Sequence, residues 1–248
     1  MSTNLLKGKV AIVTGASAGI GAATANLLAA QGARVALVAR RRERLTALCE
    51  EIAAAGGEAA AFAADVADEA QAGTTVAAVI AHFGQVDILV NNAGIIRPGG
   101  IVGADAADWR DTFDINLLGP MYWSRAVLPG MLERGAGHIV TVSSNAAKGP
   151  GAPTNNAYAA SKHAITAFCG GLRREVGPQG VRVTIVEPGA THTEIAETIA
   201  EPGARDAMRE HLYNSTAMQA GDIAAAICYA LAQHPRVNVD EIWLTPTK

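Results

Sequence analysis

The sequence predicts an α/β fold in which a single domain holds a doubly wound parallel β-sheet flanked by helices on both faces. Short β-rich segments alternate with longer helical segments along the 248 residues. The strand segments are apolar on both faces, as in a parallel sheet that helices cover on both sides. No linker rich in Pro, Gly or Ser and no internal repeat interrupts this alternation. We therefore expect one domain over residues 1–248.

The first half of the chain predicts three strand–helix units. The expected elements, in order, are strand 9–14, helix 19–32, strand 34–39, helix 41–57, strand 59–65 and helix 68–83. The strand of residues 59–65 is the weakest of the three. The first two helices end in glycine, a common helix stop.

The second half continues the pattern with one less regular segment. The expected elements are strand 86–94 running into a loop, helix 105–134, strand 138–144, helix 157–176, strand 181–189, helix 221–233 and strand 240–245. A break in the long helix is expected near Gly119–Pro120. Residues 192–219 are mixed and polar, and we expect them to be helical only in short pieces and to act as a substrate lid.

Composition and charge exclude several function classes. Half of the residues are hydrophobic and the net charge is −3, which offers no electrostatic basis for binding nucleic acid or a membrane. The N-terminal segment has no apolar signal core, and no later run is apolar enough to span a bilayer. Cys49, Cys169 and Cys228 match no metal-binding spacing. We expect reduced cysteines in a cytoplasmic protein without a metal site.

A glycine-rich loop lies between the first strand and the first helix. The stretch TGASAGIG covers residues 14–21 and places Gly15, Gly19 and Gly21 where a ligand can approach the backbone closely. The start of the helix then offers free N–H groups to a pyrophosphate. The spacing is not G-x-G-x-x-G and lacks the Gly-Lys-Ser/Thr ending of a P-loop, which argues against nucleotide hydrolysis. The alternative is a plain glycine-rich turn.

Arginines follow the second strand, where a site for NAD would place an acidic residue. Ala39 occupies that position in the stretch LVARRRERL, and Arg40, Arg41 and Arg42 come next. An arginine there can pair with a 2′-phosphate, which favours NADP(H) over NAD(H). The alternative is a solvated basic helix start. Asp65, after the third strand, is a candidate to bind an adenine amino group or, alternatively, to cap the next helix.

Tyr158 and Lys162 lie four residues apart in NNAYAASKHAI, residues 155–165. In a helix the phenol and the ammonium share one face, one turn apart. Taken alone, the pair is better explained by a tyrosine packed inward and a lysine reaching solvent, because such pairs are frequent by chance.

Six motifs together resemble the short-chain dehydrogenases/reductases. They are TGASAGIG, NNAG (91–94), INLLG (115–119), VSS (142–144), YAASK (158–162) and EPGATHT (187–193), in the family's order. The resemblance covers about residues 8–194 and implies a Rossmann-type fold, a nicotinamide cofactor and a homo-oligomer, either tetramer or dimer. It implies the catalytic set Asn116, Ser144, Tyr158 and Lys162.

The resemblance also assigns a cofactor site. Asn91 is expected near the cofactor, and Ile185 beside the nicotinamide. The predicted cofactor-binding residues are Gly15, Ser17, Gly19, Ile20, Gly21, Arg40, Arg41, Asp65, Val66, Asn92, Ala93, Gly94, Tyr158, Lys162, Pro188, Gly189, Thr191 and Thr193. Of the adjacent Ser143 and Ser144, which alternate faces on a strand, the family motif selects Ser144.

Carbonyl chemistry suits this set. An oxygen that gains negative charge during hydride transfer needs a proton, which a phenol can supply and a phenolate can take back. Lys162 is expected to lower the pKa of Tyr158, Ser144 to donate to the substrate oxygen, and Asn116 to support a water chain to Lys162.

Substrate contacts are expected from residues 94–100, 145–157 and 192–219. The candidates are Asn145, Lys148, Asn155, His192 and Tyr213. Lys148 and His192 are interpreted as solvated loop residues, with His192 the better candidate for a contact. The C-terminal segment resembles the branch that includes clavulanate-aldehyde reductases and dehydrogenases of serine and related 3-hydroxy acids. This implies NADP(H)-dependent interconversion of a small alcohol and its carbonyl compound.

Two other functions compete with this interpretation. One is a catalytically silent NADP(H)-sensing protein on the same fold, since fold alone does not imply function. Its weakness is that a sensor does not need Asn116, Ser144, Tyr158 and Lys162 together. The other is a nucleic-acid binder that uses the run Arg40–Arg44, which the acidic balance and scarce aromatic residues disfavour.

Overall fold

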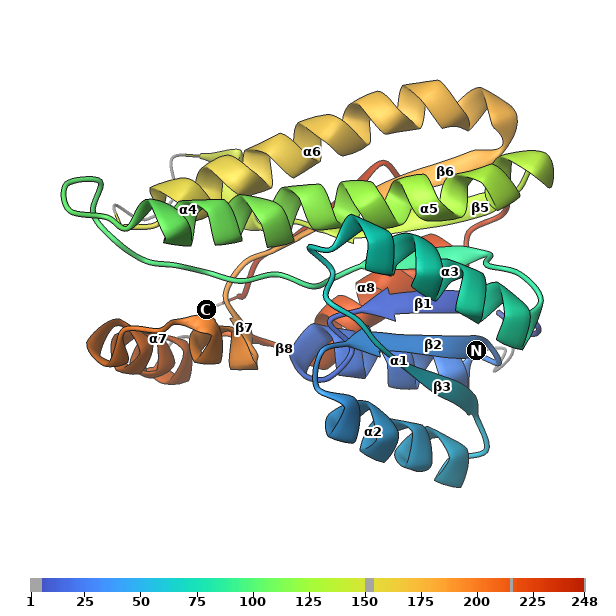
Figure 1. Cartoon of the computed structure of the whole chain (residues 1–248), viewed down its shortest axis with the longest axis horizontal. Helices are drawn as coiled ribbons and strands as arrows, with labels where there is room; N and C mark the ends of the chain where they lie inside the picture. The colour runs from blue at the N-terminus through green and yellow to red at the C-terminus, as the bar shows by residue number, and fades with distance from the viewer. Residues whose placement is uncertain (1–5, 150–153, 215, 248) are drawn as a thin grey trace.

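A seven-stranded sheet forms the centre of the molecule. The computed structural model describes residues 6–149, 154–214 and 216–247. Within these ranges the strands run in the order β3-β2-β1-β4-β5-β6-β9, and every neighbouring pair is parallel. Helices cover both faces of the sheet (Figure 1). The predicted doubly wound α/β fold class is therefore confirmed.

The strands agree with the sequence prediction to within two residues at most ends. They are β1 (Val10–Thr14), β2 (Arg34–Ala39), β3 (Glu58–Ala63), β4 (Ile88–Asn91), β5 (Gly137–Val142), β6 (Val181–Pro188) and β9 (Glu241–Leu244). A separate parallel pair, β7 (Thr191–His192) and β8 (Met218–Gln219), was not predicted. This pair joins the two ends of the expected lid.

The helices lie in two layers. One layer, with α3 to α6, lies on one face of the sheet, and the other, with α1, α2 and α8, lies on the opposite face (Figure 1). None of the helices in the described part of the chain combines the length and apolar character needed to cross a bilayer. The helices are α1 (Gly19–Ala30), α2 (Arg42–Ala54), α3 (Glu69–Phe83), α4 (Ala106–Phe113), α5 (Gly119–Glu133), α6 (Asn156–Val176), α7 (Pro202–Asn214) and α8 (Ala220–Leu231).

Shorter helical turns connect some of these elements. A π-helical turn, η1 (Asp114–Leu118), joins α4 to α5. Three turns are 3-10 helical: η2 (Asn145–Lys148), η3 (Gly177–Gln179) and η4 (Glu194–Thr198). Two of them, η2 and η4, begin directly after motifs that the sequence assigned to the site.

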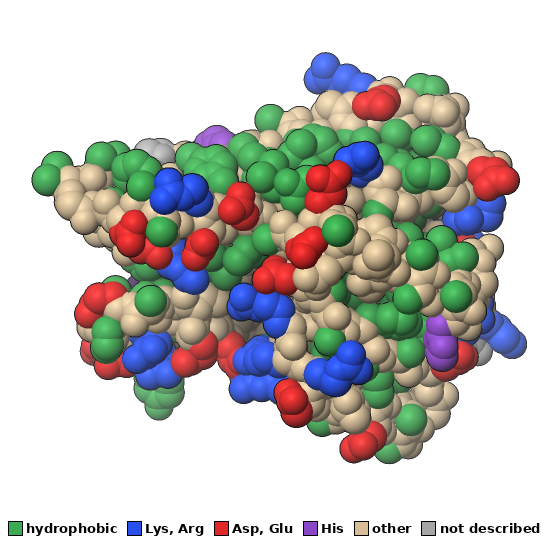
Figure 2. All heavy atoms as spheres, viewed as in Figure 1, with side chains coloured by type: hydrophobic (Ala, Val, Ile, Leu, Met, Phe, Trp, Pro, Cys, Tyr) green, Lys and Arg blue, Asp and Glu red, His purple; other side chains and the backbone are tan. Residues whose placement is uncertain are grey.

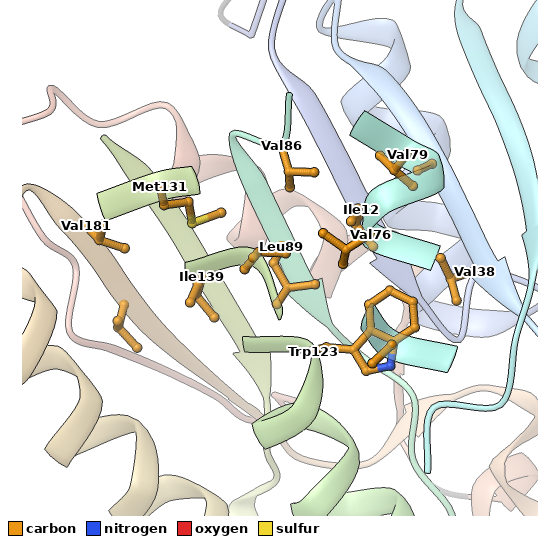
Figure 3. Close-up of a cluster of buried hydrophobic side chains, with 14 of the residues drawn as sticks. Ile12, Val38, Val76, Val79, Val86, Leu89, Trp123, Met131, Ile139 and Val181 are labelled. Atoms are coloured by element: carbon orange, nitrogen blue, oxygen red, sulfur yellow. The ribbon is translucent and has the colours of Figure 1, made fainter. Parts of the chain in front are cut away.

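The central strands contribute to two hydrophobic cores because their side chains alternate between faces. Ile12 of β1 joins the core under α3, α5 and α6, where Trp123 is fully buried (Figure 3). Val13, the next residue, joins the core with Leu28 of α1 and Ile223 of α8. Both faces of the sheet are thus dry, which explains why the strand segments show no polar alternation.

The break expected near Gly119–Pro120 is the π-helical turn η1, which separates α4 from α5. Helix α5 begins at Gly119, and Pro120 occupies its first turn, where a missing N–H costs no hydrogen bond. The prediction for the polar segment 192–219 was wrong. Residues 192–219 are not helical only in short pieces, since α7 has 13 residues. Arg209 of α7 forms ion pairs with Asp206, one turn earlier, and with Glu197, which support this polar helix.

The strand order reverses at β1, which pairs with β2 on one side and β4 on the other. Connections that leave these strands diverge to opposite faces of the sheet. Sheets of this type bind ligands in the crevice outside the carboxyl ends of the strands at such a reversal. The fold therefore places the site near the ends of β1 and β4.

His138 is a buried base on β5. It is 1% exposed, and its Nε2 lies 2.8 Å from Thr184 Oγ1. Burial, together with the nearby Arg182 charge, lowers the pKa of His138 to about 3. In the unfolded chain the imidazole of His138 is protonated near the ordinary pKa of 6.5, whereas in the folded chain it stays neutral down to a lower pH. Stability is therefore lost as pH falls from about 6.5 toward about 3.

We expect His138→Gln to flatten the fall in stability on acidification. Glutamine keeps a polar partner for Thr184 but cannot titrate. The histidine should contribute a slope of up to about 1.4 kcal/mol per pH unit in the free energy of unfolding. Urea unfolding of both proteins between about pH 7 and about pH 4 measures this slope. Identical slopes would contradict the assignment.

Candidate active site

A cavity of about 1110 Å³ lies at the carboxyl ends of the strands. The loops after β1 to β6 line it, and α7 contributes further lining residues. All of the predicted catalytic and cofactor-binding residues line this cavity except Gly21 and Asn116. Residues predicted from separate motifs therefore meet in one place.

The glycine loop makes close backbone contacts. Gly15 has φ +65°, and a Cβ there would lie 2.8 Å from the Cα of Ala93. A Cβ at Gly21 would lie 2.3 Å from the carbonyl oxygen of Gly15. Gly21 thus allows the turn to close on itself and does not face the cavity. No side chain caps the start of α1, so its first N–H groups are available to an anion.

Asn92 ties the loop after β4 to the loop after β1. Its Nδ2 donates to the carbonyl oxygen of Thr14 at 2.9 Å, and its backbone N–H donates to Thr14 Oγ1 at 3.0 Å. Asn91, expected near the cofactor, instead points away: its Nδ2 donates to Pro120 O and Ser124 Oγ. Adjacent residues on a strand face opposite ways, and Asn91 is still within β4. Ile185, expected beside the nicotinamide, is buried in the core within β6.

The basic residues after β2 differ in their surroundings. Arg41 donates to Ser17 Oγ from both Nε and Nη2, at 3.2 and 2.9 Å. Arg40 lies 3.8 Å from Asp65, and both line the cavity. Arg42 is exposed and does not line it. Two of the three arginines can therefore meet a ligand, and Ser17 lies beside one of them.

Asp65 is not the helix cap that the sequence left open as an alternative. Its Oδ1 accepts the N–H of Ala67 in the loop, whereas Asp68 caps α3 by accepting the N–H of Gln71. Asp65 lines the cavity next to Arg40. It is placed where an adenine amino group could reach it.

Tyr158, Ser144 and Lys162 come together at the inner end of the cavity. Helix α6 carries the tyrosine and the lysine, and the lysine Nζ lies 5.6 Å from the centre of the phenol ring. Ser144 hydrogen-bonds the phenol from the end of β5. Ser143 faces the other way, toward Thr166 and the carbonyl oxygen of Lys162. The choice of Ser144 over Ser143 agrees with this geometry.

Burial controls both ionisable groups. It raises the pKa of Tyr158 above its ordinary value, and the hydrogen bond with Ser144 offsets part of that rise. Burial also lowers the pKa of Lys162 to about 8. The ammonium donates to Val142 O at 3.1 Å. The net shift of the Tyr158 pKa is upward, opposite to the direction expected from Lys162, because burial is the larger effect.

Asn116 supports the site from behind the cavity. It lies in the π-helical turn η1 and is 1% exposed. Its Oδ1 accepts the N–H of Ile95, and its Nδ2 donates to Ile95 O and to Ser161 Oγ. The side chain therefore holds the loop after β4 against α6, the helix of Tyr158. Turns of this kind occur often at functional sites.

Lys148 is not the solvated residue that the sequence suggested. Its Nζ lies 2.6 Å from Glu187 Oε2 and also hydrogen-bonds Glu241. Glu187 is fully buried at the end of β6. Burial lowers the pKa of Lys148, but the hydrogen bonds to Glu187 and Glu241 outweigh it and leave that pKa raised. A glutamate inside the apolar stretch VRVTIVEPG was the sequence signal for a buried cation partner.

The substrate candidates divide into two groups. Asn145 and Asn155 line the cavity, whereas His192 and Tyr213 do not. Tyr213 is 84% exposed on the outer side of α7, and His192 pairs with β8. Part of the loop 145–157 lies outside the described residues. The segment 192–219 does contribute to the cavity, through α7, but the residues that line it there were not among the candidates: Ala204, Ala207, Met208, His211 and Leu212.

These features fit a nicotinamide dinucleotide. The tight glycine loop and the uncapped start of α1 suit the pyrophosphate, and Asp65 suits the adenine. The buried polar end with Tyr158 and Lys162 suits the reactive ring. Among the described residues no group of His, Cys, Asp and Glu is arranged to hold a metal ion.

The sequence matches a family model described as short chain dehydrogenase over residues 9–203. A short chain dehydrogenase of Pseudocercospora fijiensis is 39% identical, over 94% of this chain and 78% of its own. The 2,3-dihydro-2,3-dihydroxybenzoate dehydrogenase of Bacillus subtilis is 41% identical, over 79% of this chain and 74% of its own. The likeness thus extends beyond the motifs.

Solved structures share the fold over almost the whole chain. A metagenomic short-chain oxidoreductase in complex with NADP has a TM-score of 0.84 at 34% identity and covers 99% of this chain and 100% of its own. A serine dehydrogenase with NADP⁺ has a TM-score of 0.87 at 33% identity, covering 95% and 94%. A protein of Burkholderia phymatum in complex with NAD has a TM-score of 0.88 at 28% identity, covering 96% and 89%.

We expect Gly21→Ala to abolish the stabilisation of the protein by NADP⁺ in thermal unfolding. The added Cβ would clash with the backbone of Gly15, so the loop must open and lose its ligand geometry. The expected stability cost is about 2 kcal/mol. Gly73→Ala in α3 is the control: its Cβ meets nothing within 4 Å, and it should stabilise by about 0.5–1 kcal/mol. Retained NADP⁺ stabilisation in the Gly21 variant would contradict the assignment.

We expect Lys148→Met to lower the free energy of unfolding by about 2–4 kcal/mol, because it leaves Glu187 buried without its cation. Lys9→Met is the control, since Lys9 pairs with Asp87 while its own side chain is 53% exposed. That variant should lose at most about 1 kcal/mol. Denaturant unfolding of both variants makes the comparison. Equal losses would show that the Lys148 pair behaves as a surface ion pair.

Proposed function

The chain belongs to the short-chain dehydrogenases, as its motifs predicted, and from this premise we propose that it is an NADP(H)-dependent oxidoreductase for a small alcohol and its carbonyl compound. One observation carries the proposal. Tyr158, Ser144 and the buried Lys162 meet at the end of the same cavity that the glycine loop borders. The proton donor, Tyr158, and the glycine loop proposed to bind the dinucleotide therefore line the same cavity.

The polar cluster also argues for turnover over mere cofactor sensing. Lys162 is 5% exposed, and no carboxylate is paired with its ammonium among the described residues. Burying a cation in this way opposes folding. A binding protein has no need of this arrangement, whereas a proton-transfer site does. Buried ionisable groups with shifted pKa values, such as Lys162, concentrate at active sites.

The proposed mechanism assigns one task to each side chain. When bound, the cofactor supplies or accepts the hydride. Ser144 donates a hydrogen bond to the substrate oxygen, and Tyr158 gives that oxygen a proton as negative charge develops on it. Lys162 stabilises the phenolate that this leaves. Asn116 acts as a positioning residue, because its side chain is committed to Ile95 and Ser161.

The raised pKa of Tyr158 favours carbonyl reduction at neutral pH. A phenol whose pKa lies above the ordinary value keeps its proton and has it ready for the substrate. Alcohol oxidation needs the phenolate, which forms more readily as pH rises. We therefore propose reduction as the direction that neutral conditions support, with oxidation gaining as the solution becomes alkaline.

The preference for NADP(H) rests on the residues after β2. Ala39 leaves no carboxylate for the ribose 2′-hydroxyl. Arg40 and Arg41 line the cavity, and Arg41 donates to Ser17 of the glycine loop. Guanidinium groups suit a 2′-phosphate. NADP(H) complexes of similar proteins support this choice, although the Burkholderia phymatum protein has NAD bound.

The substrate enters beside α7, which we propose to be the lid. Residues from α7 line the cavity together with Asn145 and Asn155. The amides of Asn145 and Asn155 can form hydrogen bonds, and Met208 and Leu212 offer apolar contacts. This combination suits a small molecule with both apolar and hydrogen-bonding parts. Similarity to a serine dehydrogenase supports the branch that acts on 3-hydroxy acids and related aldehydes.

The proposal includes a cytoplasmic homo-oligomer, a tetramer or dimer. All three cysteines are free, which suits a reducing compartment. Trp109 on α4, Tyr229 on α8 and Trp243 on β9 are large apolar side chains with 40–60% of their surface exposed. Such side chains are typical of surfaces that a second subunit covers.

We expect Tyr158→Phe to lower turnover by about 10²–10⁴-fold while leaving NADP⁺ binding nearly unchanged. Turnover is followed as NADPH oxidation with a panel of small aldehydes, ketones and oxo acids, and binding as thermal stabilisation by NADP⁺. Tyr229→Phe, on the exposed side of α8, is the control and should keep full turnover. Full activity of the Tyr158 variant would refute the mechanism. Cofactor binding without turnover by the unmodified protein on every carbonyl would favour the sensing function.

A further inference from the structure

Glu194 links the cofactor end of the cavity to the proposed lid. It is the first residue of η4, directly after Thr193. Its Oε1 and Oε2 accept from Arg44 Nη1 at 2.8 and 2.7 Å, and its Oε2 accepts from Arg41 Nη1 at 3.2 Å. Two arginines of the segment that the sequence assigned to the 2′-phosphate are therefore already paired with a carboxylate.

Glu194 reaches these arginines because the chain before it packs on the glycine loop. A Cβ at Gly19 would lie 3.1 Å from the Cβ of Thr193, so the two segments touch. Arg41 spans the gap: it donates to Ser17 Oγ on the loop with Nε and Nη2, and to Glu194 with Nη1. Glu194, Arg41 and Ser17 all stand at the same corner, and Glu194 and Ser17 both line the cavity.

The charge balance at this corner decides how strongly it attracts a phosphate. Figure 2 shows arginine and lysine side chains next to acidic ones on the face that carries α2 and α7. Arg41, Arg44 and Glu194 each have 44–49% of their side-chain surface exposed, so solvent screens them only in part. A 2′-phosphate brings nearly two negative charges to the same guanidinium groups. It must then displace Glu194 or lie beside it.

We propose that Glu194 is a specificity-determining residue that competes with the cofactor 2′-phosphate for Arg41 and Arg44. The inference rests on the proposed NADP(H) function. It adds a residue that reduces the preference for NADP(H) over NAD(H). Glu194 weakens the binding of NADP(H), which carries the 2′-phosphate, and leaves the binding of NAD(H) almost unaffected. The preference of this chain is then set by two opposing elements, the basic start of α2 and one carboxylate at the start of η4.

The test measures dissociation constants rather than turnover. Binding of NADP⁺ and NAD⁺ is compared by calorimetry for the unmodified protein and for Glu194→Gln, at one ionic strength. The adenosine fragments 2′,5′-ADP and 5′-AMP are measured as well, because they differ at the same phosphate but lack the nicotinamide end. Glu51→Gln is the control: it removes one charge from the other end of α2, where Glu51 accepts from Asn26.

We expect Glu194→Gln to tighten NADP⁺ and 2′,5′-ADP by about three- to tenfold, as befits partly exposed ion pairs. NAD⁺ and 5′-AMP should change by less than about twofold, and Glu51→Gln should leave all four nearly unchanged. An unchanged ratio of NADP⁺ to NAD⁺ affinity in Glu194→Gln would overturn the inference. So would weaker NADP⁺ binding, which would mean that Glu194 orients the arginines for the phosphate.

The outcome for the unmodified protein separates this inference from the proposed function. If it binds neither dinucleotide, the proposed function fails and the inference fails with it. If it binds NADP⁺ and Glu194→Gln does not alter the ratio, only the inference fails. Glu194 is exposed, so the variant is expected to fold, and a thermal unfolding scan without ligand verifies this.

Discussion

The burial of the sheet on both faces is the constraint on which the rest of the structure depends. Side chains of β1 enter one core at Ile12 and the other at Val13, and both positions are dry. A strand in such a sheet offers no place along its length for an unpaired polar group. Functional groups are therefore confined to the ends of the strands. The reversal of strand order at β1 then opens a crevice at one edge, and the cavity lies there.

Close packing between loops turns this crevice into a shaped site. Thr14 accepts from the backbone of Asn92 and Ala93 and so joins the ends of β1 and β4. The glycine loop can lie against that junction only because Gly15 lacks a side chain. Asn116 holds the next part of the loop after β4 against α6. The positions of Tyr158 and Lys162 relative to the glycine loop thus follow from backbone contacts between distant segments.

The site handles buried charge in two ways. Lys162 is a cation with a backbone carbonyl as its partner, and burial lowers its pKa to about 8. Lys148, a few residues after Ser144, has two carboxylate partners, and their hydrogen bonds keep its pKa raised. The first arrangement leaves a group poised for proton chemistry, and the second fastens η2 to β6 and β9. The ion pairs of Glu194 with Arg41 and Arg44 differ from both, because these side chains are partly exposed and the arginines can pair with a phosphate instead.

The sequence alone determined the fold class, the order of the elements and most of the residues that line the cavity at the ends of the strands. Apolar periodicity indicates directly which residues are buried. The turns after β1, β4 and β5 carry short contiguous motifs, which can be recognised without knowing their distant neighbours. Ala39 and the arginines after it are also the sequence features from which we propose a preference for NADP(H). These features depend on neighbours in the chain and on the two faces of each strand, so they can be recognised without a structure.

Only the tertiary structure decided the partners of charged side chains. Lys148 looked solvated until β6 and β9 placed Glu187 and Glu241 beside it. Glu194 meets Arg44 across 150 positions of sequence, and the α7 wall of the cavity is formed by a polar helix without a motif. The rise in the Tyr158 pKa also depends on how deeply α6 buries the phenol. Long-range pairing and burial depth arise from the packing of whole elements, and no local pattern encodes them.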